Sequence, residues 1–233
     1  MSAGHAIGVY DLVVDHPTGA GPLRALDCRQ LVVDAGSSVA IVGPSGCGKS
    51  TLLGVLAGLG PPTRGTVTIG DTDITALSDA GCAAFRKRAL GVVYQADNLL
   101  PFLTVAENVG PQLALCGDHA DAPRTIAELL NQLGLAELGD RLPGELSGGQ
   151  RQRAAVARAI VHGPSVILAD EPTGSLDEAN AEVVVDLLVD AHRRLGATLL
   201  LVTHNPVVAE SMQRIVSLRD GEIVGDREAF RAG

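Results

Sequence analysis

The amino-acid sequence predicts an α/β fold in which a mainly helical segment interrupts a core of buried, parallel strands. Short apolar runs at residues 38–43, 165–170 and 197–203 have the length and continuity of strands that are buried on both faces of a sheet. Strand-like and helix-like segments alternate toward both ends of the chain, whereas residues 79–161 have a mainly helical pattern. A sheet core with a helical insertion is the simplest account of these observations.

Local signals place the individual elements in order along the chain. A turn rich in glycine and proline at residues 17–22 separates two apolar segments, so we expect the chain to begin with two joined strands. The expected strands cover residues 7–14, 24–33, 38–43, 63–70, 165–170, 197–203, 213–218 and 222–225. The expected helices cover residues 50–57, 79–88, 104–115, 122–133, 149–162 and 178–194, with Pro111 expected to kink one of them.

Composition limits the classes of function. The chain has 27 acidic and 18 basic residues and a formal net charge of −9, which argues against a broad nucleic-acid-binding surface. The cysteines show no C-x-x-C spacing, so we expect free thiols rather than structural zinc. No apolar run reaches the ~18 residues needed to span a bilayer, and the first residues do not resemble a signal peptide. We therefore expect a cytosolic protein whose membrane role would require a partner.

No linker divides the chain into independent parts. We expect one domain over residues 1–233, with a core of about 1–85 and 163–233 and a helical subdomain of about 86–162.

A glycine-rich loop, GPSGCGKST at residues 43–51, follows a buried strand and precedes a helix. It matches G-x-x-x-x-G-K-[ST], a pattern whose backbone N–H groups surround phosphates. Lys49 would reach the β- and γ-phosphates, and Ser50 would bind Mg²⁺. The residues expected to contact the nucleotide in this glycine loop are Gly43, Pro44, Ser45, Gly46, Cys47, Gly48, Lys49, Ser50 and Thr51.

The lysine in this loop is one of only two in the chain, Lys49 and Lys87, since arginine supplies almost every other basic residue. A compact ammonium fits among phosphates where a forked guanidinium would not. Cys47 lies beside it, at a helix N-terminus and among backbone N–H groups, so we expect an accessible, reactive thiolate. The alternative is an inert cysteine chosen for its small size.

Two acidic residues end the apolar strand at 165–170. Asp170 at the carboxyl end of this strand would face the glycine loop and bind Mg²⁺ through water, and Glu171 would polarise an attacking water. Solvated acids at a strand end are the alternative when this pair is considered alone.

A second glycine-rich helix start lies at residues 146–150, LSGGQ. Ser147, Gly148 and Gly149 present backbone N–H groups that suit an anion. Taken alone, this segment is more often an ordinary helix cap. It also leaves open why one chain would carry two helix starts that favour phosphate.

Taken together, these motifs resemble the nucleotide-binding subunits of ABC transporters over essentially the whole chain. LSGGQ at 146–150 is similar to the signature motif of that family, and residues 94–108 are similar to its Q-loop region, with Gln95 as the glutamine. Residues 174–178 resemble the D-loop, and 200–205 carry a histidine, His204, at the position of the switch histidine.

The resemblance implies a P-loop NTPase (RecA-like) core with an ABC-type antiparallel β subdomain and an inserted α-helical subdomain. It implies that two copies pack head to tail and that ATP lies between the glycine loop of one copy and the signature motif of the other, which would explain the second helix start. The residues implied to contact ATP beyond the glycine loop are His16, Gln95, Ser147, Gly148, Gly149, Gln150 and Asp177.

The resemblance also implies catalytic roles. Glu171 would be the general base, Lys49 and Gln95 would act at the phosphates and the attacking water, and His204 would sense the γ-phosphate. Mg²⁺ would be bound by Ser50, Gln95 and Asp170. His16 departs from the family pattern, because an aromatic ring usually stacks on adenine at the position that His16 occupies.

Within the family, residues 97–109 and 168–177 resemble the lipoprotein-release and macrolide-efflux branch, although Ser175 replaces its usual asparagine. This implies a transmembrane permease with a large extracytoplasmic domain, a location at the cytoplasmic face of the inner membrane, and export of lipoprotein, peptide or drug. The alternative is an ATPase that transmits force to a cell-envelope process without transport. A soluble ABC ATPase that acts on DNA or ribosomes is disfavoured, because the chain has no room for duplicated cassettes or long coiled coils.

Overall fold

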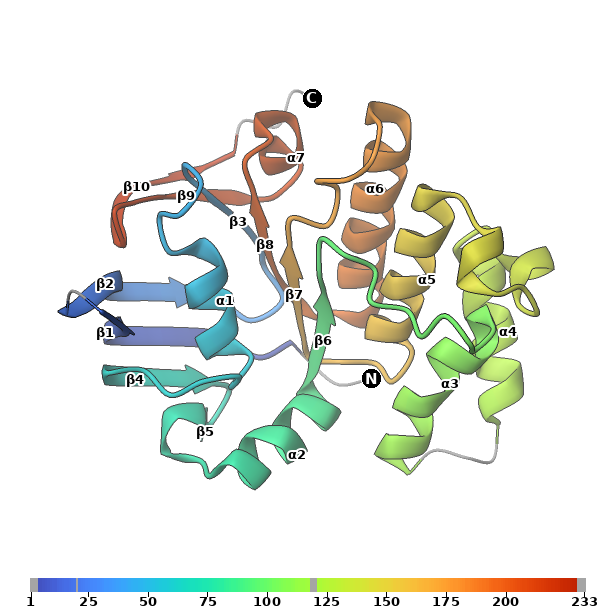
Figure 1. Ribbon diagram of the computed structural model, residues 1–233, viewed down its shortest axis with the longest axis horizontal. Coiled ribbons are helices and arrows are strands. Elements are labelled where there is room, and N and C mark those ends of the chain that lie inside the picture. Colours follow the sequence, from blue (N-terminus) through green and yellow to red (C-terminus); the bar gives the residue numbers. More distant parts are fainter. Residues whose placement is uncertain (1–3, 20, 118–120, 230–233) are drawn as a thin grey trace.

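The computed structural model describes residues 4–19, 21–117 and 121–229. Its centre is a six-stranded sheet with the strand order β10-β9-β3-β8-β7-β6 (Figure 1). All neighbouring strands run parallel except β10, which pairs antiparallel with β9 at the edge. The strands of this sheet are β3 (Ser38–Val42), β6 (Leu90–Val93), β7 (Val166–Asp170), β8 (Thr198–Thr203), β9 (Arg214–Arg219) and β10 (Glu222–Glu228).

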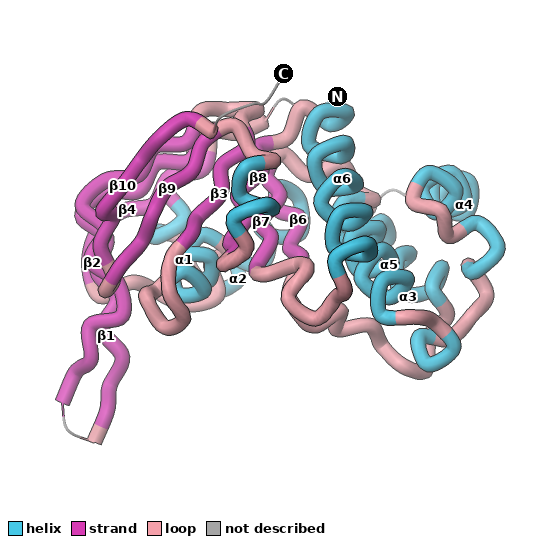
Figure 2. Tube along the Cα trace, turned by 90° about the horizontal axis from the view of Figure 1, so that it is seen from above, coloured by secondary structure: helices cyan, strands magenta, loops and turns pink. Residues whose placement is uncertain are grey.

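A second, antiparallel sheet has the order β2-β1-β4-β5. Its strands are β1 (Ile7–Thr18), β2 (Gly21–Val33), β4 (Arg64–Ile69) and β5 (Thr72–Asp73). The pairing of β1 with β2 continues to Thr18 and Gly21, so strand replaces most of the turn expected at 17–22. The end of this hairpin projects from the body of the molecule (Figure 2).

The helices divide the molecule into two apolar cores. Helix α1 (Lys49–Leu56) lies between the two sheets, where Leu52 and Leu56 belong to a cluster with residues of both (Figure 1). The other face of the large sheet packs against α5 (Gly148–Ile160) and α6 (Glu178–Leu195), and this second core extends into α3 and α4. The remaining helices are α2 (Asp79–Ala89), α3 (Val105–Cys116), α4 (Ala122–Gln132) and α7 (Pro206–Glu210).

The predicted fold class is confirmed, and every expected strand and helix has a counterpart within a few residues. The sequence reading missed α7, the two-residue strand β5, and β6, which lies inside the stretch expected to be helical. A run of four residues is too short to show a periodicity, and β6 gains its partner only when it pairs with β7, far along the chain. Pro111 lies inside α3, as expected. Within the described residues, no helix is long and apolar enough to cross a membrane.

Candidate functional site

A cavity of about 590 Å³ opens where the carboxyl ends of the parallel strands meet. The glycine loop follows β3, Glu171 follows β7, His204 follows β8, and Gln95 comes shortly after β6. Adjacent parallel strands end at the same edge of a sheet, so segments that are far apart in sequence meet at this cavity. Its lining consists of Ser45, Gly46, Gly48, Lys49, Ser50, Thr51, Gln95, Glu171 and His204.

The glycine loop is held in place by close contact with β2. Gly48 is the N-cap of α1 and has a φ of 102°, which favours glycine. A Cβ atom there would lie 2.4 Å from the carbonyl oxygen of Ala25. The loop therefore enters α1 with its backbone N–H groups available at the helix N-terminus, where an anion is stabilised.

Lys49 is a buried cation inside this loop. Its Nζ atom donates hydrogen bonds of 2.8 Å to the carbonyl oxygen of Gly43 and 2.9 Å to that of Pro44. The ammonium therefore lies at the floor of the cavity, where phosphate oxygens are attractive partners for it.

The expectation that Cys47 is accessible is wrong, because only 4% of its surface is exposed. Its backbone N–H donates to Pro44 and its carbonyl accepts a hydrogen bond from Gly221, so the loop folds over the thiol. Reactivity of a cysteine requires access as well as a stabilised thiolate. The structure favours the interpretation that Cys47 is a small side chain packed under the loop.

Ser50 and Asp170 converge at one side of the cavity. The Ser50 hydroxyl donates a 3.2 Å hydrogen bond to Asp170 Oδ1 at the end of β7. Burial raises the pKa of the Asp170 carboxyl, and the neighbouring Glu171 adds to this, whereas the bond from Ser50 and the charge of Lys49 lower it. A nearby cation would stabilise the ionised form of a partly buried carboxylate of this kind.

Glu171 is held in an unusual backbone conformation, with a φ of 47°. Its N–H donates to the Val202 carbonyl, and its Oε2 accepts hydrogen bonds from the backbone N–H of His204 at 3.3 Å and from His204 Nδ1 at 2.9 Å. Since a carboxylate only accepts, Nδ1 of His204 carries the proton in this pair. Left-handed backbone at a bulky residue is strained and is concentrated at functional sites.

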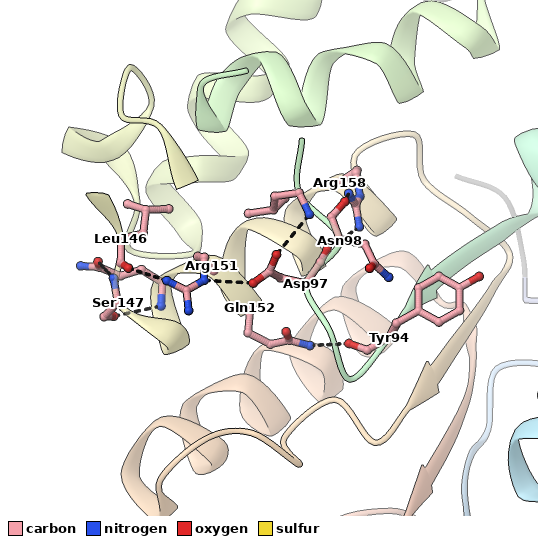
Figure 3. A network of polar contacts seen from close by, with 10 residues as sticks. Tyr94, Asp97, Asn98, Leu146, Ser147, Arg151, Gln152 and Arg158 are labelled. Atoms are coloured by element: carbon pink, nitrogen blue, oxygen red, sulfur yellow. Dashed lines mark hydrogen bonds and ion pairs between the residues drawn. The ribbon is translucent and has the colours of Figure 1, made fainter. Parts of the chain in front are cut away.

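Gln95 enters the cavity from the Q-loop region and lies against the loop after β7. A Cβ atom on Gly174 would come 2.8 Å from the Gln95 amide nitrogen. Within the Q-loop region, the buried Asn108 side chain donates to nearby backbone carbonyls such as that of Leu100. Side chains of α5 hold this region from outside: Gln152 donates to the Tyr94 carbonyl, and Arg158 donates to the Asp97 and Asn98 carbonyls (Figure 3). Sequence reasoning missed these anchors, since they act over separations of up to 61 residues.

The signature motif forms the start of α5, away from this cavity. The Ser147 hydroxyl accepts from the Gln150 N–H, and the Gln150 side chain accepts from the Ser147 N–H, which makes a capping box. Ser147 and Gly148 are exposed. A Cβ atom on Gly149 would lie 2.2 Å from Asn180 Oδ1 on α6, so only glycine fits there.

Two other predicted contacts also lie outside the cavity. Asp177 caps α6, and its carboxylate accepts hydrogen bonds from Asn180, whose contacts lower the pKa of Asp177. His16 is exposed on the projecting hairpin, opposite Leu23. The structure thus brings together the glycine loop, Gln95, Asp170, Glu171 and His204, and leaves the signature motif, Asp177 and His16 on the surface.

Comparison with known proteins identifies this arrangement. The family model described as "ABC transporter" matches residues 26–174, which include the glycine loop, Gln95, the signature motif and Glu171. The chain belongs to the ABC transporter family. Cassettes of this family bind and hydrolyse ATP, so the predicted ATPase activity is confirmed.

The relatives are similar over most of this ABC cassette. It is 44% identical over 219 residues to the lipoprotein-releasing system ATP-binding protein LolD of Geobacter metallireducens, covering 94% of this chain and 97% of that one. It is 43% identical over 216 residues to the macrolide export ATP-binding/permease protein MacB of Bradyrhizobium diazoefficiens, covering 92% of this chain and 33% of that one. Among solved structures, the ATP-binding cassette MJ0796, a dimer in a post-hydrolysis state bound to ADP and Pi, is 33% identical with a TM-score of 0.88, covering 96% of this chain and 99% of that one.

Proposed function

We propose that this ABC cassette is the ATP-hydrolysing subunit of a membrane complex that exports or extrudes lipoprotein, peptide or drug. The observation that carries the proposal is the 44% identity over almost the entire length of both chains to a protein named for lipoprotein release. The similarity to a macrolide exporter supports the same class of transport. We place the subunit at the cytoplasmic face of the inner membrane, attached through a permease that has a large extracytoplasmic domain.

The cavity supports a specific assignment of roles. The backbone N–H groups of the glycine loop bind the phosphates of ATP, and Lys49 neutralises the β- and γ-phosphates from the floor of the cavity. Glu171 accepts a proton from the attacking water, and His204, which lines the same cavity, orients Glu171 through their hydrogen bond. Gln95, which lines the same cavity, also orients the water.

The donor set fits Mg²⁺. Ser50 Oγ and Asp170 Oδ1 are oxygen atoms 3.2 Å apart, and Gln95 lines the same cavity. Among the residues that the structure describes, no cluster of three or more His, Cys, Asp or Glu side chains could hold a metal ion. Mg²⁺ commonly binds through one or two carboxylates together with substrate phosphates, which agrees with this sparse set. When bound here, it would neutralise charge on the phosphates.

Exposure of the signature motif supports action on a second copy. Ser147 and Gly148 face solvent at a helix N-terminus, where an anion is stabilised, and neither residue lines the cavity that the glycine loop forms. We therefore propose an ATP-sandwich dimer in which Ser147, Gly149 and the capped Asp177 complete the site of the partner copy. The dimeric form of the similar cassette MJ0796 supports this assembly.

The permease is proposed to dock beside the Q-loop region. Leu100 and Phe102 follow Gln95 on the surface, and Phe102 is 72% exposed. Large apolar side chains left in water at the end of a catalytic loop favour contact with a partner protein.

Dimerisation should depend on ATP. A Glu171→Gln variant that retains the nucleotide is expected to sediment as a monomer alone and as a dimer with Mg-ATP, because the nucleotides join two polar faces. Sedimentation velocity measures this, and the same variant that also carries Lys49→Ala is the control that should stay monomeric. A tight dimer without nucleotide would contradict the proposal.

We also expect the side chain of His16 to stack on the adenine ring of ATP. His16→Tyr should tighten ATP binding and His16→Ala should weaken it, each by about two- to tenfold, because stacking depends on ring area. The maximal hydrolysis rate should not change. Leu23→Ala alters the cross-strand partner of His16 without removing a ring and serves as the control in a fluorescent-nucleotide titration. If neither His16 variant changes the affinity, another residue contacts adenine.

A further inference from the structure

One side chain joins the Q-loop region to the signature motif. Arg151, in the first turn of α5, donates a hydrogen bond from Nε to Asp97 Oδ2 at 3.0 Å. Its Nη1 atom donates to the carbonyl oxygen of Leu146 at 2.8 Å, immediately before Ser147 (Figure 3). A single planar guanidinium therefore spans two functional segments that are far apart in the sequence.

Arg151 differs in this respect from its neighbours on α5. Gln152 and Arg158 bind backbone carbonyls of the Q-loop region from the body of the helix. Within the described residues, Arg151 is the one that bonds both to this region and to the loop ahead of α5. Removal of the Arg151 side chain would leave the hydrogen bonds from Gln152 and Arg158 to the Q-loop region in place. It would break the connection that Arg151 makes between Asp97 and the Leu146 carbonyl.

The orientation of the Asp97 carboxylate depends on the conformation of the Q-loop region. It lies two residues after Gln95, and its Oδ1 atom accepts a 3.1 Å hydrogen bond from the Leu99 N–H. Asn98, between them, has a φ of 50°. The loop therefore orients the carboxylate that accepts the hydrogen bond from Arg151. A shift of the loop would move this carboxylate, and the Arg151 guanidinium would move with it.

The ion pair is not a major support of the fold. The side chains of Arg151 and Asp97 are 37% and 29% exposed, and ion pairs that reach solvent contribute little to stability. The Q-loop region also retains the bonds from Arg158 and Gln152. We therefore expect that breaking the ion pair changes the relative positions of the Q-loop region and the signature motif and has little effect on the stability of the fold.

We propose that Arg151 is a positioning residue that aligns the signature motif with the Q-loop region through Asp97. While Gln95 occupies the cavity, Asp97 holds Arg151, and Arg151 holds the Leu146 carbonyl so that Ser147 and Gly148 reach the nucleotide of a second copy. This inference rests on the proposed ATP-sandwich dimer. It couples the nucleotide site of one copy to the surface it offers to the other.

The test uses the Glu171→Gln chain as the parent. Adding Arg151→Met should weaken ATP-dependent dimerisation by about tenfold in sedimentation equilibrium, while ATP affinity of the monomer stays within about twofold. Arg153→Met is the matched control, because Arg153 lies on the same helix and, within the described part of the chain, donates to the Leu133 and Gly134 carbonyls and not to the Q-loop region or the signature motif. Its dimerisation should equal that of the parent.

A double-mutant cycle separates coupling from general damage. Asp97→Asn keeps the oxygen that binds the Leu99 N–H and presents an amide N–H₂ group to Arg151, so it breaks only the ion pair. If the pair carries the coupling, the double variant Asp97→Asn with Arg151→Met should dimerise no more weakly than Arg151→Met alone. Arg151→Lys should restore part of the loss.

The remaining outcomes of these experiments distinguish failure of the Arg151 inference from failure of the proposed dimer. Additive effects of the two substitutions, or unchanged dimerisation of Arg151→Met, would overturn the inference and leave the proposed function standing. If the parent does not dimerise with Mg-ATP, the sandwich dimer itself fails, and the inference fails with it.

Discussion

Replacing Glu171 by glutamine is expected to lower the rate of ATP turnover by about 10²- to 10⁴-fold while leaving ATP affinity almost unchanged. The side chain lies in the cavity and is oriented by two hydrogen bonds from His204. Glutamine has nearly the same shape and still accepts a hydrogen bond through its carbonyl oxygen, but it cannot take a proton from water. The substitution should therefore remove the chemical step alone.

Steady-state phosphate release and an equilibrium titration with a fluorescent ATP analogue measure the two effects separately. Glu137→Gln, on the exposed surface of the helical part, is the control and should behave as the unmodified chain. Hydrolysis by Glu171→Gln at a rate close to that of the unmodified chain would assign the base to another residue.

Lys49→Ala should instead fail at binding. The buried ammonium supplies the charge nearest to the β- and γ-phosphates, and hydrogen bonds to charged groups are among the strongest in proteins. Loss of these contacts is expected to weaken ATP affinity by about 100-fold and to abolish turnover at cellular ATP concentrations.

The chain offers a matched control, because its only other lysine is Lys87, on α2 and outside the cavity. Lys87→Ala carries the same change of charge and should bind ATP normally. Isothermal titration calorimetry with ATP would compare both variants. Equal affinities for Lys49→Ala and Lys87→Ala would mean that the glycine loop does not bind the phosphates in the way proposed.

Much of the site could be predicted because its pieces are local. Strand, glycine loop and helix are contiguous in residues 38–57, so a short pattern specifies them together. Asp170 is recognisable for a similar reason, since it ends a continuous apolar strand, whereas His204 is recognisable only through the resemblance of the whole motif set to the family. The antiparallel hairpin and the capping of α5 by Ser147 also follow from neighbours within a few residues.

The parts that sequence reasoning missed depend on contacts between distant segments. The four residues of β6 become a strand only beside β7, and Cys47 becomes buried only when the glycine loop packs against its surroundings. The hydrogen bond between Arg151 and Asp97 joins residues that are 54 positions apart in the sequence. The close contact between Gly149 and Asn180 is made between two different helices, α5 and α6.

Local sequence thus determined the elements, the phosphate-binding loop and the identities of most chemical groups, since backbone preference and burial pattern act over a few residues. The order β3-β8-β7-β6, which differs from the order along the chain, was decided by the tertiary structure. That order brings Gln95, Glu171 and His204 to one cavity and leaves the signature motif facing outward. The physical reason is that every strand offers the same backbone hydrogen-bonding groups at its edges, so the choice of neighbour depends on how the helices pack on both buried faces of the sheet, and that packing involves the whole core at once.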